Sequence, residues 1–189
     1  MSEHIVGVRG KYYNGRLYRS TLEANTAEML DKMGIPWEYE IKTYVIQEGF
    51  YCPWQKRKVL PIEYKPDFFI GPIMLETKGF ETPDWKIKKK VFFKYLKEND
   101  PDAIYYMVKN SKQIIEALDN HWPYLGMAVE VTSKPSRKNP SEVKVYDSIK
   151  EAMADLGLEG KYITPIIKSL TGEKQWVYNY SWKLKKIEL

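Results

Sequence analysis

Residues 64–78 read YKPDFFIGPIMLETK, and this stretch decides the fold expected for the chain. Its first half is apolar and aromatic around a single Asp67, Gly71 and Pro72 interrupt it, and a second apolar run leads to Glu76. Aromatic and β-branched runs bounded by Gly and Pro are typical of strands joined by a tight turn. The sequence therefore predicts two adjacent strands, and antiparallel pairing across the turn would bring Asp67 near Glu76.

The charged residues of this stretch point to metal-assisted chemistry. Glu76 and Lys78 are two residues apart, so they project from the same face of the second strand. Two carboxylates at the end of an apolar sheet repel each other unless a divalent cation neutralises them, and oxygen ligands suit Mg²⁺. Lys78 could orient a water nucleophile or offset charge on a phosphate. The alternative is that Asp67 and Glu76 form ordinary ion pairs with Lys65 and Lys78 on a sheet surface.

The pattern Pro66-Asp67 followed by Glu76-Thr77-Lys78 resembles the motif of the PD-(D/E)XK nuclease superfamily. The expected order of elements is that of the superfamily core: a helix with an early acid, a strand, the two strands above, a helix over 85–96 and a strand over 103–108. The resemblance covers roughly the first two thirds of the chain. It is closest to phage and transposon members, such as phage Holliday-junction endonucleases. It implies an α/β fold with a restriction-endonuclease-like core, in which helices flank a mixed sheet.

The resemblance also implies an activity, the Mg²⁺-dependent hydrolysis of DNA phosphodiesters, with Mn²⁺ as a substitute. It assigns metal binding to the Asp67 and Glu76 carboxylates and to the Thr77 carbonyl, and it assigns orientation of the attacking water to Lys78. Glu23, from the first helix, would be an auxiliary catalytic carboxylate. Ser20-x-x-Glu23 is also a capping box, which satisfies free backbone amides at a helix start. Both roles of Glu23 stay open, and they do not exclude each other.

Composition agrees with a polyanionic partner. The 189 residues carry a net charge of +5 with a pI near 9.0, which favours binding to nucleic acid. A single cysteine, Cys52, excludes an intramolecular disulfide. His4 and His121 are the only histidines, so the sequence offers few ligands for zinc and few candidates for a catalytic histidine. No run is long enough for a membrane span and the amino terminus lacks the apolar core of a signal peptide. We expect a cytoplasmic protein of a bacterium or a virus-infected cell, without a membrane partner.

Turn and periodicity signals predict further elements. Asn14-Gly15 is a strong hairpin signal within residues 11–20, and the helix that follows is expected to end at Gly34. The remaining expected elements are a strand over 37–46, an aromatic and basic loop over 49–58, a helix over 111–118 and an edge strand over 126–131.

Basic side chains near the motif are candidates for DNA contact. Lys86 and Lys90 belong to the polar face of the helix over 85–96, where they would face phosphates if the site is a nuclease. Arg57 lies among the aromatic residues of the 49–58 loop, which could grip a backbone or stack on bases. The plainer alternatives are a solvated helix face and a long hairpin tip.

Residues 132–142 (TSKPSRKNPSE) are polar and rich in Pro and Ser, so we expect a linker. The linker would separate a nuclease domain, 1–131, from a small unit, 143–189. That unit has a capping box at Ser148-x-x-Glu151 and two short helices, which is a helix-turn-helix pattern. It resembles the modular DNA-binding repeat of homing endonucleases, with Asn179 where that repeat usually has Gly. The contacts expected from its second helix are Thr164, Lys168 and Ser169.

Together these observations predict a metal-dependent endonuclease acting on double-stranded DNA, and a site-specific homing or mobile-element enzyme is the first choice. A structure-selective endonuclease, such as a junction resolvase, is the alternative, and it would be expected to act as a homodimer. A third alternative is a non-catalytic DNA-binding protein with a degenerate nuclease core. The unit over 143–189 could instead pack on the core or mediate dimerisation.

Overall fold

The computed structural model describes residues 10–187, a mixed α/β protein that divides into two compact units. Unit 2 is continuous and comprises Trp37–Val108, whereas unit 1 combines residues 1–36 with residues 109–189. The division therefore differs from the expected boundary at residues 131–143. None of the helices found between residues 10 and 187 is both long and apolar enough to cross a membrane.

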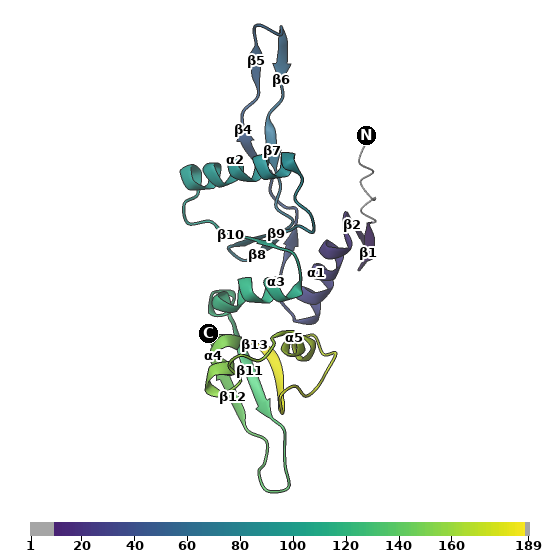
Figure 1. The fold of residues 1–189 in the computed structure, drawn as a ribbon, viewed down its shortest axis with the longest axis vertical. Coiled ribbons are helices and arrows are strands. Elements are labelled where there is room, and N and C mark those ends of the chain that lie inside the picture. The colour runs from purple at the N-terminus through teal and green to yellow at the C-terminus, as the bar shows by residue number, and fades with distance from the viewer. Residues whose placement is uncertain (1–9, 188–189) are drawn as a thin grey trace. The chain divides into compact units, whose positions relative to one another are not determined.

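A four-stranded sheet forms the centre of unit 2 (Figure 1). Its strands are β3 (Glu38–Tyr39), β8 (Phe68–Ile70), β9 (Ile73–Thr77) and β10 (Ile104–Val108), in the spatial order β10-β9-β8-β3. The predicted hairpin is present, because β8 pairs antiparallel with β9 across a turn in which Gly71 has a φ of 54°. β10 runs parallel to β9, which requires a crossover connection. Helix α2 (Pro83–Asn99) provides that crossover.

The apolar side of α2 packs on the face of unit 2 that carries Met74 of the sheet and the ring of Tyr64. The core there comprises Tyr44, Ile46, Tyr64, Met74, Phe92 and Leu96. Phe92 is fully buried, and its ring stacks on that of Tyr64 with a centroid distance of 4.1 Å. Residues on the opposite face of the sheet, such as Phe68 and Leu75, are also fully buried. The sheet is thus apolar on both faces, as expected for strands that include a parallel pair.

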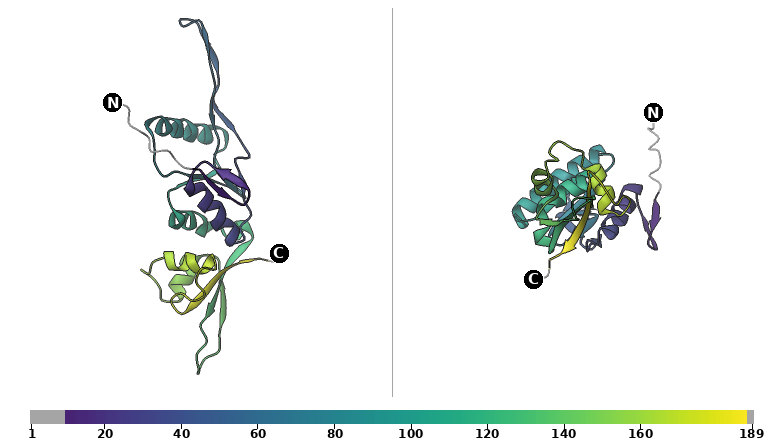
Figure 2. Two further views of the ribbon diagram at one scale, coloured as in Figure 1. Left: turned by 90° about the vertical axis from the view of Figure 1, so that its right-hand side faces the viewer. Right: turned by 90° about the horizontal axis from the view of Figure 1, so that it is seen from below.

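Residues 44–64 form a long antiparallel hairpin, called the arm below, which extends away from the sheet of unit 2 (Figures 1 and 2). Its lower part pairs β4 (Tyr44–Gln47) with β7 (Ile62–Tyr64), and its outer part pairs β5 (Phe50–Cys52) with β6 (Arg57–Val59). The 49–58 segment is the long hairpin tip that was the alternative to a binding loop. One expectation is corrected: the strand expected over 37–46 is split into β3 and β4, which belong to different sheets.

The first part of unit 1 follows the sequence signals closely. β1 (Lys11–Tyr13) and β2 (Arg16–Tyr18) form the predicted hairpin, with Asn14 and Gly15 at positive φ. Helix α1 (Thr21–Lys32) begins at the N-cap Ser20 and is followed by Gly34 at a φ of 69°. α1 packs against α3 (Ser111–Leu118), and α3 continues into two 3₁₀ turns, η1 (Asp119–His121) and η2 (Pro123–Leu125).

The carboxyl-terminal part of unit 1 is a three-stranded sheet with two short helices. β11 (Met127–Ser133) lies between β12 (Val143–Tyr146) and β13 (Tyr180–Lys186), so it is the central strand and not the expected edge strand. The two helices are α4 (Ile149–Asp155) and α5 (Thr164–Leu170). Thr132 pairs with both Val143 and Ser181. The expected linker is therefore wrong, because residues 134–142 only connect two neighbouring strands.

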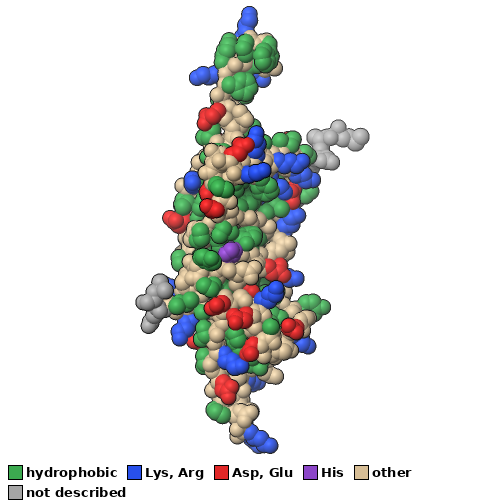
Figure 3. Space-filling model, turned by 90° about the vertical axis from the view of Figure 1, so that its left-hand side faces the viewer, with side chains coloured by type: hydrophobic (Ala, Val, Ile, Leu, Met, Phe, Trp, Pro, Cys, Tyr) green, Lys and Arg blue, Asp and Glu red, His purple; other side chains and the backbone are tan. Residues whose placement is uncertain are grey.

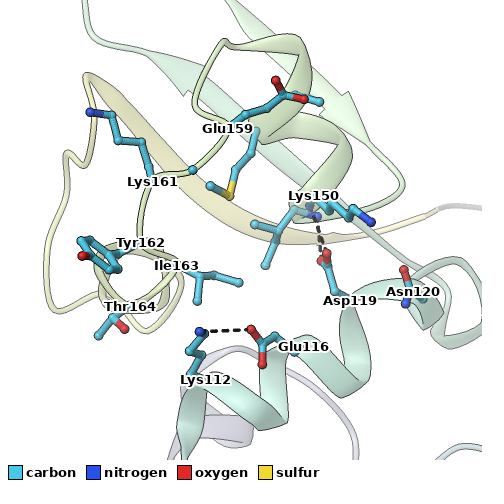
Figure 4. A pocket seen from close by; sticks show the side chains of 14 residues that line it. Lys112, Glu116, Asp119, Asn120, Lys150, Glu159, Lys161, Tyr162, Ile163 and Thr164 are labelled. Carbon is cyan, nitrogen blue, oxygen red and sulfur yellow. Dashed lines mark hydrogen bonds and ion pairs between the residues drawn. The ribbon is translucent and has the colours of Figure 1, made fainter.

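Asp119 connects the end of α3 to helix α4 of the carboxyl-terminal part of unit 1. Its carboxylate accepts hydrogen bonds from the Ile149 N–H at 2.7 Å, the Lys150 N–H at 3.0 Å and the Trp122 indole N–H at 2.9 Å. Asp119 thus caps the start of α4 from a position 30 residues earlier in the chain (Figure 4). This buried contact explains why residues 143–189 belong to the same compact unit as α3.

Candidate functional site

Asp67 stands immediately before β8, at the end of the sheet in unit 2. Only 3% of its surface is exposed. Its Oδ2 accepts hydrogen bonds from both the backbone N–H of Thr77, at 2.8 Å, and the Thr77 hydroxyl, at 2.7 Å. Both of these bonds go to the same oxygen, so they fix the carboxylate against β9 without using Oδ1. The sequence spacing had predicted this proximity of the two strands.

Glu76 is the neighbour of Asp67 across the two strands. The register pairs Phe68 with Leu75, and its continuation by one residue sets Asp67 opposite Glu76. Side chains directly opposite in antiparallel strands share a face of the sheet. Glu76 is 5% exposed, so two acidic side chains are buried next to each other. Burial of like charges is unfavourable unless cations or hydrogen-bond donors compensate for it.

Lys78 supplies a cation beside this pair. Its Nζ lies 3.9 Å from Glu76 Oε1 and 5.1 Å from the ring centroid of Trp85. Trp85 is buried in the first turn of α2, where its N–H donates to the N-cap Thr82 at 3.2 Å. The backbone of Lys78 is also held, because its N–H donates to the Val108 carbonyl at 2.9 Å. The ammonium group is therefore positioned by the strand, a carboxylate and an aromatic ring.

Two tyrosines that the sequence did not single out lie beside Glu76. The hydroxyls of Tyr64 and Tyr105 are hydrogen-bonded to each other at 2.6 Å. Burial raises the pKa of both phenols, and the negative charge of Glu76 raises it further. Both phenols therefore stay protonated at neutral pH, as donors near a buried carboxylate. The sequence offered a single indication that these tyrosines belong to the site, which was the position of Tyr64 three residues before Asp67.

Glu40 connects the strand β3 to the site through its backbone. Its N–H donates to the Asp67 carbonyl at 2.9 Å, and its φ is 51°. A positive φ is uncommon for a residue with a side chain, and here it occurs where the chain leaves β3. The Glu40 carboxylate pairs with Lys65 at 3.6 Å. Of the ordinary ion pairs considered as the alternative, the one between Lys78 and Glu76 is present, whereas Lys65 pairs with Glu40.

Glu23 forms the capping box that its spacing predicted. The Glu23 N–H donates to Ser20 Oγ at 3.1 Å, and Ser20 Oγ donates to Glu23 Oε1 at 2.8 Å. The Arg19 N–H donates to Oε2 at 3.1 Å. Glu23 is buried in unit 1, whereas Asp67 and Glu76 belong to unit 2. The capping role is therefore confirmed, and the catalytic role stays a prediction.

The candidate DNA contacts fall into three groups. Lys86 and Lys90 are exposed on α2, and Arg57 is exposed near the tip of the arm. Thr164 and Lys168 are exposed on α5. Ser169 is a wrong prediction, because it is only 7% exposed and its hydroxyl accepts from the Trp182 N–H at 3.0 Å.

The ligands available at the site suit a hard cation. Within residues 10–187, no three or more His, Cys, Asp or Glu side chains gather closely enough to hold a metal ion. A cation beside Asp67 and Glu76 would thus need other oxygens, from the Thr77 carbonyl and from water. Mg²⁺ binds in this manner, through one or two carboxylates with water retained. His121 lies in unit 1, and His4 is outside the described residues.

A separate cavity of about 530 Å³ lies in unit 1, between α3 and the segment from α4 to the start of α5. Figure 4 shows Asp119, Lys112 and Glu116 on one side of it and Lys161, Tyr162 and Thr164 on the other. Asp119 already accepts three hydrogen bonds, and Lys112 pairs with Glu116 at 3.5 Å. Two of the three acidic residues that line this cavity, Asp119 and Glu116, are thus engaged in structural contacts.

Comparison of the chain with protein-family models, with curated proteins and with solved structures finds no match. The functional argument therefore rests on the geometry of the site.

Proposed function

We propose that the protein is a metal-dependent endonuclease that hydrolyses DNA phosphodiester bonds. The observation that carries this proposal is the pair of buried carboxylates, Asp67 and Glu76, with the Lys78 ammonium 3.9 Å from Glu76. A fold that only needed stability would gain little from two neighbouring buried acids. A phosphoryl-transfer site needs such a pair, because it must hold a cation against an anionic substrate.

Each residue has a distinct role in the proposed reaction. Asp67, Glu76 and the Thr77 carbonyl would hold Mg²⁺, which neutralises charge on the phosphate when it is bound. The bonds from Thr77 to Asp67 Oδ2 keep that carboxylate in a fixed orientation. Lys78 orients the attacking water and stabilises negative charge that grows on the phosphate. Glu23 remains a proposed auxiliary carboxylate.

The topology of unit 2 supports a restriction-endonuclease-like core. The strand order β10-β9-β8-β3 is mixed, with one parallel pair and two antiparallel pairs. The chain passes from β9 through α2 to β10, so the helix after the Glu76-Thr77-Lys78 segment covers the face that carries Tyr64 and Met74. The order β3, β8, β9, α2, β10 agrees with the part of the implied order that follows the first helix, although the arm is inserted between β3 and β8 and the first helix belongs to unit 1.

Duplex DNA is the proposed substrate, and lysines on α2 are its proposed phosphate contacts. Lys86 and Lys90 are both exposed on this helix, whose first turn also holds Trp85 beside Lys78. Because these lysines and the site belong to unit 2, neutralised phosphates would lie near the carboxylates. Such contacts supply affinity without reading sequence.

The choice between a homing and a structure-selective enzyme depends on α5. A sequence-reading helix needs several side chains that reach base edges. α5 has seven residues, of which Thr164 and Lys168 are exposed and Ser169 is buried. The homing proposal now rests on these two contacts. The structure-selective alternative gains support from the exposed aromatic residues of the arm.

Plasmid nicking in Mg²⁺ tests the proposed reaction. Asp67→Asn and Lys78→Ala are expected to reduce nicking by about 100-fold or more, the usual loss when a transition-state contact is removed. Asp102→Asn and Lys97→Ala make the same charge changes at exposed positions of unit 2 and should leave nicking unchanged. Undiminished nicking by a folded Asp67→Asn protein would refute the assignment. DNA binding without nicking by the wild type would favour the non-catalytic alternative.

A further inference from the structure

The tip of the arm exposes large aromatic side chains that contact no apolar core. Trp54 is 83% exposed, Tyr51 is 60% exposed and Phe50 is 51% exposed. Leu60 and Ile62 continue this apolar surface toward the base of the arm. Single exposed apolar residues are common, but several on one projecting hairpin mark a binding surface.

Charge on the same segment identifies the kind of partner. Residues 50–62 contain three basic residues, Lys56, Arg57 and Lys58, and no acidic residue. Tyr51 lies directly opposite Lys58, so an aromatic and a basic side chain share one face of the arm, whereas Arg57 lies opposite Cys52 on the other face. Figure 3 shows green hydrophobic and blue basic side chains together at the end of the arm. This pattern complements a ligand that has both anionic groups and flat apolar faces, which is the chemistry of a nucleic acid.

The arm has a fixed connection to the carboxylate site. Its base is anchored because Tyr44 and Tyr64 are buried against Phe92 of α2. Tyr64 ends β7, and Asp67 follows three residues later. From Tyr64 to Arg57 there are seven residue steps, which span about 20–25 Å in an extended strand. That length corresponds to about six or seven nucleotides of a helical strand.

We propose that the arm binds DNA at positions where bases are unpaired, with Trp54 and Tyr51 stacking on the exposed bases. Bases inside a continuous duplex are stacked on one another, so an aromatic ring finds a free base face only where that stack is interrupted. Lys58 and Arg57 hold the adjacent phosphates. The arm therefore selects bulged, forked or branched DNA. This inference rests on the proposed function, which it deepens by naming the substrate class.

A binding assay in EDTA tests the inference apart from cleavage. The full-length protein is titrated against three labelled DNAs of one sequence: a perfect duplex, a duplex with a central unpaired bulge, and a single strand. The wild type should bind the bulged duplex more tightly than the perfect one. Trp54→Ala should weaken binding to the bulged duplex and single strand by about 5- to 150-fold, the effect of one lost base stack. Binding to the perfect duplex should stay unchanged.

Two further variants separate stacking from other effects. Tyr124→Ala removes an equally exposed aromatic residue from unit 1 and should bind all three DNAs like the wild type. Arg57→Ala should weaken binding to every DNA. It should also reduce the slope of log K against log salt concentration by about one, the effect of losing one phosphate contact. The proposal is refuted if Trp54→Ala binds the bulged duplex as tightly as the wild type. It is also refuted if Trp54→Ala loses binding to anionic lipid vesicles while its DNA binding is intact. Absence of cleavage in Mg²⁺ would refute the nuclease proposal and leave these binding results unaffected.

Discussion

Replacement of Asp119 tests the corrected organisation of unit 1. Asp119→Ala removes the acceptor for three donors, the N–H groups of Ile149 and Lys150 and the indole N–H of Trp122. A buried donor left without a partner costs about 1–3 kcal/mol. Since Lys150 is only partly buried in this contact, its N–H can regain water. The two remaining donors give an expected loss in the free energy of unfolding of about 2–6 kcal/mol.

Urea and thermal unfolding, followed by circular dichroism, measure this loss. For a chain of this size, 1 kcal/mol corresponds to about 2–4 °C in Tm, so Asp119→Ala should lower the Tm by roughly 4–24 °C. Asp119→Asn keeps one acceptor oxygen and should lose about half as much. Asp147→Ala, at an exposed position beside α4, is the control. A stability of Asp119→Ala within 1 kcal/mol of the wild type would contradict the contact and restore the model of a separate module.

Three other predictions concern the site and the β12–α4 contact. Mg²⁺ at 100 times its Kd should stabilise the wild type by about 2.7 kcal/mol, a Tm increase of about 5–10 °C, and differential scanning fluorimetry should show no increase for Glu76→Gln. Tyr105→Phe removes the 2.6 Å bond to Tyr64 and should slow nicking about fivefold, with unchanged DNA affinity in a gel-shift assay. Lys144 holds the pKa of the Asp155 carboxyl below its usual value. That contribution to stability is present above the unfolded-state pKa of Asp155 and is lost as the pH falls through the lowered pKa. Lys144→Ala should therefore raise the Asp155 pKa in a carbon-detected NMR titration.

Local signals in the sequence were sufficient for the elements that carry the site. The turn at Gly71 and Pro72 joins β8 and β9 in the expected register, which places Asp67 opposite Glu76. Both predicted capping boxes are present, at Ser20 and at Ser148. Asn179 has the expected positive φ, at 68°. These features depend on residues close together in the chain, so short patterns are enough to predict them.

Features that depend on distant residues were missed. β11 looks like an edge strand by its own sequence, but β13 pairs with it from 50 residues away. The polar 132–142 segment has a linker's composition because a solvated hairpin connection needs the same residues. By its position in the sequence, Ser169 looks like a surface residue of α5. In the structure its hydroxyl accepts a hydrogen bond from the backbone N–H of Trp182. Tyr105 was missed because only the parallel pairing of β9 with β10 brings it to Tyr64.

In the proposed function, the segment Lys65-Pro66-Asp67 connects the DNA-binding arm of unit 2 to the carboxylate site. It separates β7, the last strand of the arm, from β8, the first strand of the pair that holds the carboxylates. Pro66 has no N–H to donate, so a regular ladder cannot continue through it. The chain leaves one sheet and enters another at this point. A displacement of the arm by bound DNA would therefore act on the backbone of Asp67, whose carbonyl and carboxylate are held by Glu40 and Thr77. Those two contacts would keep the Asp67 carboxylate, a proposed metal ligand, in place when the arm moves.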